Sequence, residues 1–103
     1  MASYKIGPVD QIPVGEGRNF QVGEATIAVF RTHAGRVFAT QATCPHKNGP
    51  LADGLIGGTT LVCPLHEMQF DLCTGKALSG ECTIATFPVT EKDGNLMVEL
   101  GGD

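Results

Sequence analysis

The amino-acid sequence predicts an all-β protein, and two observations carry this prediction. Turn-forming residues recur at short intervals, because the 103 residues include 14 Gly and 6 Pro, and the segments between them are short and rich in apolar and β-branched residues. No segment has the sustained 3.6-residue period of an amphipathic helix, and residues 50–55 have room for only a short helical turn. The expected fold is therefore built from many short strands.

The expected strands differ in how their apolar residues are arranged. Residues 26–30 are apolar on both faces, as in a strand within a sandwich core, and a turn at residues 32–35 returns the chain as a hairpin. Near the end of the chain, alternate side chains share one face, first over 85–89 and then over 96–100. In chain order the expected strands are residues 26–30, 37–39, 59–62, 68–71, 85–89 and 96–100.

Length and charge restrict the classes of protein to which the chain can belong. A length of 103 residues predicts one domain, residues 1–103, without room for a second, catalytic domain. The net charge is −4, with 7 basic and 11 acidic residues and no basic run, which argues against a nucleic-acid partner. The first residues lack the apolar stretch of a secretion signal, and no segment approaches the ~20 apolar residues that span a membrane.

Two short motifs, Cys44-Pro45-His46 and Cys63-Pro64-Leu65-His66, predict a metal centre. Each motif places a thiolate and an imidazole in one tight loop, so two such loops folded together offer two sulfur and two nitrogen ligands. A structural zinc site is one alternative, although zinc sites usually draw their cysteines and their histidines from separate, unmixed pairs. Buried free cysteines beside hydrogen-bonded histidines, without any metal, are a second alternative.

The paired motifs resemble those of the Rieske iron–sulfur family, and the resemblance extends to residues 49–54, 70–75 and 86–89. It implies a [2Fe–2S] cluster in which Cys44 and Cys63 bind one iron and His46 and His66 bind the other. It also implies stacked antiparallel sheets, with residues from about 43 to about 82 forming a small cluster-binding lobe. No nucleophile–base arrangement or nucleotide-binding glycine motif is present in the sequence, so no catalytic residues are expected.

The remaining cysteines and one missing disulfide bear on the compartment. Membrane-tethered Rieske subunits carry a disulfide between the two cluster loops, and its positions here would be near Gly49 and at Leu65, neither of which is cysteine. A cytoplasmic protein is therefore expected. In that reducing compartment Cys73 and Cys82 are expected as free thiols, buried as small apolar residues, with a disulfide between them as the alternative.

The residues around the second motif predict a low reduction potential. In Rieske proteins of high potential, a serine two positions after the second histidine and a tyrosine four positions after it donate hydrogen bonds to sulfur. Here those positions are Met68 and Phe70, which cannot donate, and the carboxylate of Glu67 disfavours an added electron. The expected midpoint potential is on the order of −150 mV, at the low end of the Rieske range.

The resemblance implies a one-electron carrier between a NAD(P)H-dependent flavoprotein reductase and a terminal reductase or oxygenase. Two groups fit: Rieske ferredoxins of aromatic-ring dioxygenases, which residues 73–78 resemble, and the small subunit of assimilatory nitrite reductase, which residues 45–54 resemble and which we favour for ancestry. A redox sensor or a zinc-binding interaction module is the alternative from another class. Partners are expected to dock transiently near His46 and His66. The apolar collar expected around these histidines consists of Leu51, Pro64, Leu65 and Met68, and simple shielding of the cluster is the competing use for these residues.

Overall fold

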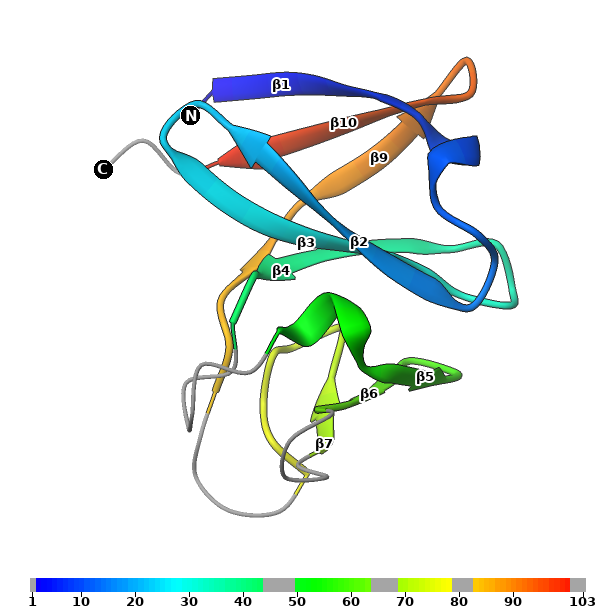
Figure 1. Ribbon diagram of the computed structural model, residues 1–103, viewed down its shortest axis with the longest axis vertical. Helices are drawn as coiled ribbons and strands as arrows, with labels where there is room; N and C mark the ends of the chain where they lie inside the picture. The colour runs from blue at the N-terminus through cyan, green and yellow to red at the C-terminus, as the bar shows by residue number, and fades with distance from the viewer. Residues whose placement is uncertain (1, 44–49, 64–68, 79–82, 101–103) are drawn as a thin grey trace.

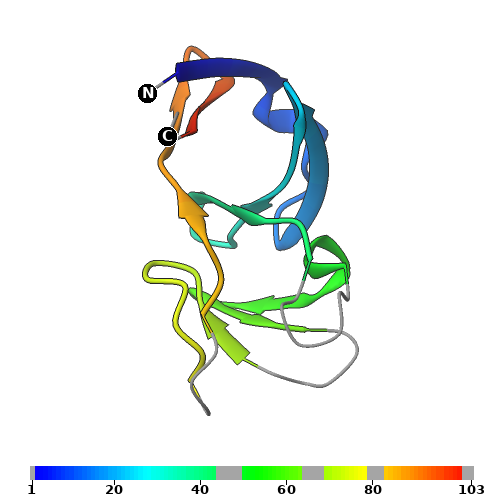
Figure 2. The ribbon, with the colours of Figure 1, turned by 90° about the vertical axis from the view of Figure 1, so that its left-hand side faces the viewer.

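The computed structural model of the chain describes residues 2–43, 50–63, 69–78 and 83–100, and its strands form three stacked antiparallel layers (Figures 1 and 2). The outer layer is the sheet β1-β10-β9, the middle layer is the sheet β2-β3-β4-β8, and a smaller lobe holds the sheet β5-β6-β7. The all-β prediction is confirmed. The strands are β1 (Ala2–Pro8), β2 (Glu16–Val22), β3 (Ala25–Arg31), β4 (Val37–Gln41), β5 (Leu55–Gly57), β6 (Thr60–Val62), β7 (Gln69–Asp71), β8 (Thr86–Phe87), β9 (Val89–Lys92) and β10 (Asn95–Leu100). Two single 3₁₀ turns, η1 (Val9–Gln11) and η2 (Leu51–Asp53), complete the elements.

Strand β3 lies at the centre of the middle layer and separates two hydrophobic cores. Successive side chains of a strand point to opposite faces, so Ile27 and Val29 pack against the outer sheet, where Leu96 and Val98 are also buried. The side chains of Ala28 and Phe30 pack on the other face, against the lobe. The prediction that residues 26–30 are apolar on both faces is confirmed, because both faces of β3 are covered.

The β3–β4 hairpin was also predicted, and its turn is closed by Thr32. The N–H of Thr32 donates to the carbonyl of Arg36 at 2.8 Å, and the Thr32 hydroxyl accepts from the N–H of Arg36 at 3.1 Å. Gly35 donates back to the Thr32 carbonyl at 3.0 Å with a positive φ of 86°. Strand register then pairs Arg31 with Val37 and continues to Ile27 with Gln41.

The single strand expected over residues 85–89 is wrong, because the chain changes sheets at Pro88. Strand β8 pairs with β4 through Phe87 opposite Ala39, whereas β9 pairs with β10 through Val89 opposite Val98. Proline has no N–H to donate to a continuing ladder. The Pro88 carbonyl instead accepts from the N–H of Glu99 at 2.9 Å. The predicted alternation is confirmed only in part, since Phe87 and Val89 both pack on the core between the two larger sheets whereas Ala85 is exposed.

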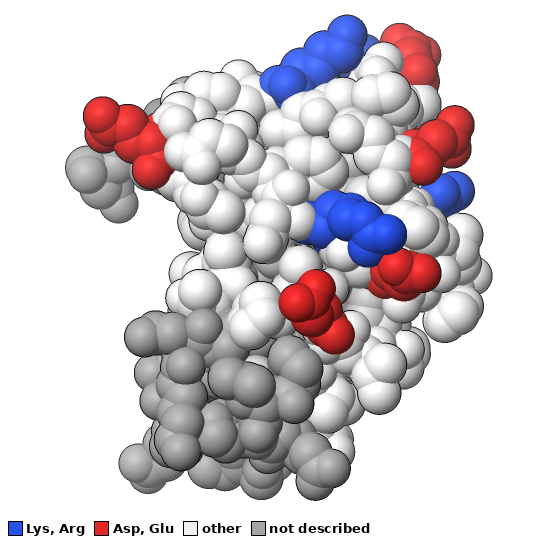
Figure 3. All heavy atoms as spheres, viewed as in Figure 1, with Lys and Arg blue, Asp and Glu red and all other residues white. Residues whose placement is uncertain are grey.

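Two further features of the described part of the chain concern its helices and its surface charge. Among these residues, no helix has the length and apolar character needed to cross a membrane. On the face shown in Figure 3, the described basic side chains lie apart from one another and beside acidic ones, as with the exposed ion pair of Arg18 and Glu16 at 3.0 Å. The described part of this face therefore carries mixed charge.

Candidate metal centre

The first predicted ligand loop opens from a stem at the end of β4. Thr43 and Pro50 form an antiparallel bridge across its base. The next pair up the stem is also joined, because the N–H of Leu51 donates to the carbonyl of Ala42 at 3.0 Å. The two ends of segment 44–49 are therefore held side by side.

The far arm of this stem is anchored in the core of the lobe. Leu51, the first residue of η2, is 0% exposed and packs with Leu61 and Phe70. Gly54 ends the turn, where a Cβ atom would collide with the carbonyl oxygen of Val62. Only glycine allows η2 to lie this close to β6. The helical turn expected within residues 50–55 is confirmed, and it seats one loop stem on the strand that leads into the other loop.

The second predicted ligand loop opens from the β6–β7 hairpin. Val62 on β6 pairs with Gln69 on β7, which closes the base of segment 63–68. Cys63 directly follows β6, and it is 1% exposed within the same core as Leu61 and Phe70. Its thiol is free. A buried cysteine at a loop stem suits either a core residue or a metal ligand, and the structure alone is compatible with both.

A third segment joins the lobe to β8 and depends on one glycine. The N–H of Gly75 donates to the Asp71 carbonyl at 2.7 Å, and its carbonyl accepts from the N–H of Ile84, also at 2.7 Å. Gly75 has a φ of 79°, and a Cβ atom there would collide with the carbonyl oxygen of Ile84. Glycine is therefore required by both its backbone angle and its close neighbour. The hydrogen bond between Gly75 and Ile84 therefore holds this third segment, the return segment from the lobe to β8, against the lobe.

The structure describes one of the four predicted ligands. Cys63 has the position given above, whereas Cys44, His46 and His66 lie outside the described residues. Within the ranges that the structure describes, no group of three or more His, Cys, Asp or Glu side chains could hold a metal ion. What the structure brings together is the two loop stems, through the shared core of Leu51, Leu61 and Phe70.

Two expectations about neighbouring residues are wrong. Leu51 was expected in an apolar collar for docking or as a shield for the cluster, and the docking use is wrong because Leu51 is fully buried, where it anchors η2 in the core. Cys73 was expected to be buried, but it is an exposed free thiol in the turn after β7, where its N–H donates to the Asp71 carboxylate at 2.9 Å. Cys82 and the remaining collar residues Pro64, Leu65 and Met68 lie outside the described part of the chain.

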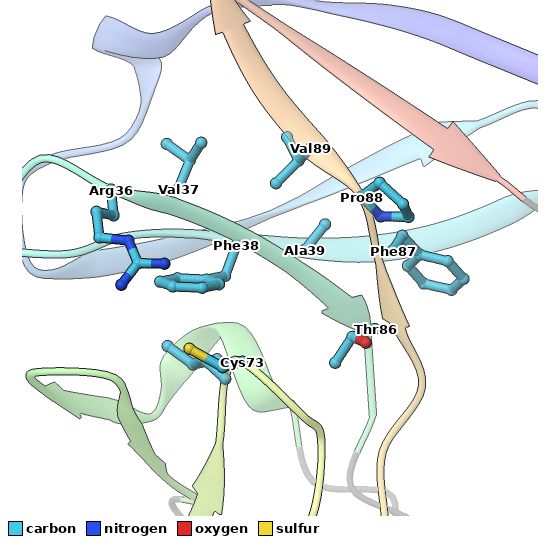
Figure 4. A pocket seen from close by; sticks show the side chains of 10 residues that line it. Arg36, Val37, Phe38, Ala39, Cys73, Thr86, Phe87, Pro88 and Val89 are labelled. Carbon is cyan, nitrogen blue, oxygen red and sulfur yellow. The ribbon is translucent and has the colours of Figure 1, made fainter.

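A groove of about 440 Å³ lies between the edge of β4, the β8–β9 junction and the turn that carries Cys73 (Figure 4). The guanidinium of Arg36 lies 4.9 Å from the ring centroid of Phe38 on one wall, and Phe87 and Pro88 form another. Among its lining residues in the described ranges, Cys73 is the only side chain of a metal-ligating type. The groove therefore does not offer a second metal centre.

Sequence reasoning missed one residue, Gln41, that helps to hold the stem of the first loop. The side chain of Gln41 at the end of β4 hydrogen-bonds both Thr43, at the first loop stem, and Ala85, which follows the third segment. Glutamine at the end of a strand is common on exposed surfaces, so the sequence carries no signal for this role. The signal is the tertiary contact between distant segments.

The donor set suits an iron–sulfur cluster. The motifs supply two thiolates and two imidazoles, which is the set that a Rieske cluster requires. The one described donor, Cys63, is buried in an apolar core where a second loop stem is packed beside it. Burial of this kind limits solvent access to a metal centre and so helps to set its potential.

Two mixed cysteine–histidine motifs whose loop stems meet on one lobe of a small β-sheet protein are the pattern expected of an iron–sulfur protein. Comparison with known families matches the Rieske [2Fe–2S] domain over residues 2–89. The chain therefore belongs to the Rieske [2Fe–2S] family. The predicted cofactor, a [2Fe–2S] cluster, is confirmed at the level of the family.

Three known proteins illustrate the similarity. The ferredoxin component of the naphthalene 1,2-dioxygenase/salicylate 5-hydroxylase systems of Ralstonia sp is 35% identical over 94 residues, which is 89% of each chain. A ferredoxin solved in complex with the oxygenase of carbazole 1,9a-dioxygenase is 32% identical with a TM-score of 0.80, covering 93% of this chain and 100% of that one. A solved nitrite reductase (NADPH) small subunit, described as putative, has a TM-score of 0.87 at 21% identity, over 97% of this chain and 100% of that one.

These relatives confirm the expected class of activity. The Ralstonia relative and a 36% identical protein of a 2,4-dinitrotoluene dioxygenase system are both named as ferredoxin components, which are electron-transfer components and not catalytic subunits. The chain is an electron carrier of the same kind. The nitrite reductase small subunit shares the fold, and at 21% identity the likeness carries no further information.

Proposed function

We propose that this chain binds its [2Fe–2S] cluster through Cys44, His46, Cys63 and His66, and that it carries single electrons to the oxygenase of a ring-hydroxylating dioxygenase system. The observation that supports the ligand set is the pair of stems, Thr43 with Pro50 and Val62 with Gln69, that close the two motif-bearing loops on one lobe. In this proposal the cysteines bind one iron and the histidines the other.

The protein's part in electron transfer is to hold its ligand loops in place and to limit water around them. When bound, the cluster accepts and releases one electron per cycle. Both loop stems pack on a buried core that contains Leu51, Leu61 and Phe70. Phe70 is 0% exposed and has no hydroxyl, so it shields the lobe without donating a hydrogen bond. This supports the expected low potential.

The unit that carries out this function is proposed to be a single Rieske domain over residues 1–103. The cluster-binding lobe, from about 43 to about 82, contains η2 and the β5-β6-β7 sheet. Its core is continuous with the inner face of β3 through Ala28 and Phe30. The two larger sheets then serve as the frame on which the lobe is mounted.

The choice of partner rests on the sequence relatives. Eight curated relatives are 33–40% identical to this chain over 68–103 aligned residues, and seven of them are named as ferredoxin components or subunits of dioxygenase systems, the eighth as a ferredoxin called CarAc. We therefore propose an oxygenase as the electron acceptor and a NAD(P)H-dependent flavoprotein as the donor. This changes the preference between the two groups that the sequence motifs left open. The nitrite reductase role remains the second candidate because its small subunits share the fold.

A reconstitution experiment separates the two partners. The purified carrier is mixed with a flavoprotein reductase, NADH and either a ring-hydroxylating oxygenase or a sirohaem nitrite reductase. Product formation that depends on the carrier is expected with the oxygenase and its aromatic substrate. Carrier-dependent reduction of nitrite, without any support of ring hydroxylation, would reverse the assignment.

The ligand set and the zinc alternative are tested on the purified protein. Two irons and two labile sulfides per chain, with visible absorption, are expected. Replacing Cys44 or Cys63 with serine is expected to abolish that absorption, whereas the matched variant at the non-ligand position Cys73 retains it. A colourless protein that contains one zinc per chain would support the interaction module instead.

We propose that partners dock on the lobe near His46 and His66. The docking surface includes a row of residues across the β5-β6-β7 sheet, whose apolar ends are the exposed leucines Leu55 and Leu78. Leu55 pairs with Val62, Val62 pairs with Gln69, and the N–H of Leu78 donates to the Gln69 carbonyl at 2.8 Å. Residues directly opposite one another share a face of the sheet. Leu55 is 75% exposed and Leu78 is 56% exposed, so the row offers apolar contact area next to the second loop.

Serine variants of this row test the docking proposal. Leu55→Ser and Leu78→Ser are expected to raise the carrier concentration needed for half-maximal oxygenase turnover several-fold, because electron-transfer contacts are small and each apolar side chain counts. Val14→Ser is the matched control, since Val14 is 47% exposed and lies outside the lobe, before β2. Equal effects of all three substitutions would remove the row from the docking surface.

A further inference from the structure

The Gln41 side chain joins two segments that flank the ligand loops. Its Nε2 donates to the carbonyl of Thr43 at 2.7 Å, and its Oε1 accepts from the N–H of Ala85 at 2.8 Å. A peptide N–H only donates and a peptide carbonyl only accepts, so these two partners fix the orientation of the amide group. Gln41 is thus held at both ends of its side-chain amide.

These contacts arise where the β4–β8 ladder ends. Thr40 pairs with Thr86 in the ladder, and the N–H of Gln41 still donates to the Ala85 carbonyl at 3.0 Å. The carbonyl of Gln41 is taken by the Thr40 hydroxyl, which donates to it at 2.8 Å. The Ala85 N–H bonds the Gln41 side chain, and the side-chain amide acts as one more peptide unit across the opening between the strands.

The position of Thr43 matters because it directly precedes Cys44. On the other arm of the stem, Leu51 is fixed by burial and by its hydrogen bond to Ala42. The arm that carries Thr43 is exposed, so burial does not hold it. The hydrogen bond from Gln41 ties the Thr43 carbonyl to the frame made by β4 and the segment before β8. It therefore restricts the direction in which the chain enters the first loop.

We propose that Gln41 is a positioning residue for the cluster, which acts by fixing the Thr43 carbonyl next to the ligand Cys44. The inference rests on the proposed ligand set, because it requires Cys44 to bind iron. It assigns to one polar side chain outside the loop the task of keeping the entry to the loop in a single conformation. Without that restraint the Cys44 thiolate samples more than one geometry. The cluster is then lost faster, and the electron paramagnetic resonance spectrum of the reduced protein becomes broader.

A second glutamine in the same fold provides a matched control. The Nε2 of Gln21 donates to the Gly23 carbonyl at 3.0 Å, and its Oε1 accepts from the Thr26 hydroxyl, also at 3.0 Å. Gln21 thus makes the same number of side-chain hydrogen bonds as Gln41, with one donated to a backbone carbonyl in each case, although its Oε1 accepts from a hydroxyl and not from a backbone N–H. It lies at the β2–β3 turn, away from the loop stems. A purely structural contribution should be similar at both positions.

The test compares Gln41→Met, Gln41→Glu and Gln21→Met as purified holoproteins. Methionine keeps the length of the side chain and removes both hydrogen bonds, whereas glutamate keeps the acceptor for Ala85 and removes the donor to Thr43. The readouts are the rate at which a chelator bleaches the visible absorption, the electron paramagnetic resonance spectrum of the reduced protein, and hydrogen exchange at the Ala85 amide. One neutral hydrogen bond corresponds to roughly two- to tenfold in such rates.

Gln41→Met is expected to lose its cluster about tenfold faster than the wild type and to give a broadened resonance spectrum. Gln41→Glu is expected to show the same two changes with slow exchange kept at Ala85, and Gln21→Met is expected to match the wild type in cluster loss and spectrum. Wild-type loss rates and spectra in both Gln41 variants would overturn the inference, and Gln41→Glu alone decides it if Gln41→Met does not fold. The visible absorption of the Cys44→Ser variant tests the ligand set separately. If Cys44→Ser keeps the absorption, the proposed function fails. If Cys44→Ser loses the absorption while both Gln41 variants behave like the wild type, only the role of Gln41 is refuted.

Discussion

The two hydrophobic cores on either side of β3 predict that equal damage to each core will have unequal effects on the metal centre. Leu51 lies in the core under the lobe and Leu96 in the core between the larger sheets, and both are 0% exposed. Leu51→Ala and Leu96→Ala therefore make the same chemical change in two places. Only Leu51 is part of a ligand-loop stem, through its hydrogen bond to Ala42.

The expected loss of stability is similar for the two variants. Each substitution removes buried carbons worth about 0.8 kcal/mol apiece and leaves a cavity that adds to the cost. We expect each variant to lose about 3 kcal/mol of unfolding free energy. For a domain of this size that corresponds to a fall in Tm of about 12–24 °C.

The assay follows unfolding and cluster loss separately in each holoprotein. Circular dichroism during denaturant titration gives the free energy of unfolding, and visible absorption under native conditions with a chelator gives the rate of cluster loss. Leu51→Ala is expected to bleach at least tenfold faster than Leu96→Ala at equal stability, because its cavity loosens the stem of the first loop. Equal bleaching rates at equal stability, or faster bleaching of Leu96→Ala, would refute the separation of the two cores.

Three further predictions follow from single sites. Cys73→Ser leaves the visible spectrum unchanged, since Cys73 is an exposed thiol outside the ligand set, and a loss of colour would show that the ligands are wrongly assigned. Gly75→Ala lowers the unfolding free energy by about 1–3 kcal/mol, because its φ of 79° and the Ile84 carbonyl leave no room for a Cβ; Gly35→Ala, at a φ of 86° but with open space, is the control for the backbone term alone. The midpoint potential is about −150 mV in a redox titration, and a value above about +100 mV would contradict the reasoning from Met68 and Phe70.

Local sequence patterns predicted much of this fold because they reflect which face of a strand is covered. The double-sided apolar run at residues 26–30 indicated a strand between two layers, and β3 has that position. The alternation of Leu96 and Val98 indicated a strand with one buried face, and both side chains are buried in β10. The expected strand over 85–89 failed at Pro88, because periodicity does not reveal that consecutive residues pair with different sheets.

The candidate site was predicted from the sequence only as far as its chemistry. The mixed motifs predict which residues are the sulfur and nitrogen donors, and the family match supports the cofactor. The sequence did not predict which side chains around the site are buried. Leu51 is apolar and adjoins a ligand loop, which suits an exposed collar and a buried anchor equally well, and only packing against Leu61 and Phe70 distinguishes the two.

The sequence by itself predicted four sulfur and nitrogen donors paired within two short motifs, and it determined the all-β character of the chain. These properties are local, since they depend on residues a few positions apart. Tertiary structure decided which side chains hold the loops. Gln41 meets Ala85 across 44 positions of sequence, and Gly75 meets the Ile84 carbonyl only because the return segment folds back onto the lobe. Such contacts depend on how distant segments pack, and no local pattern of residues encodes them.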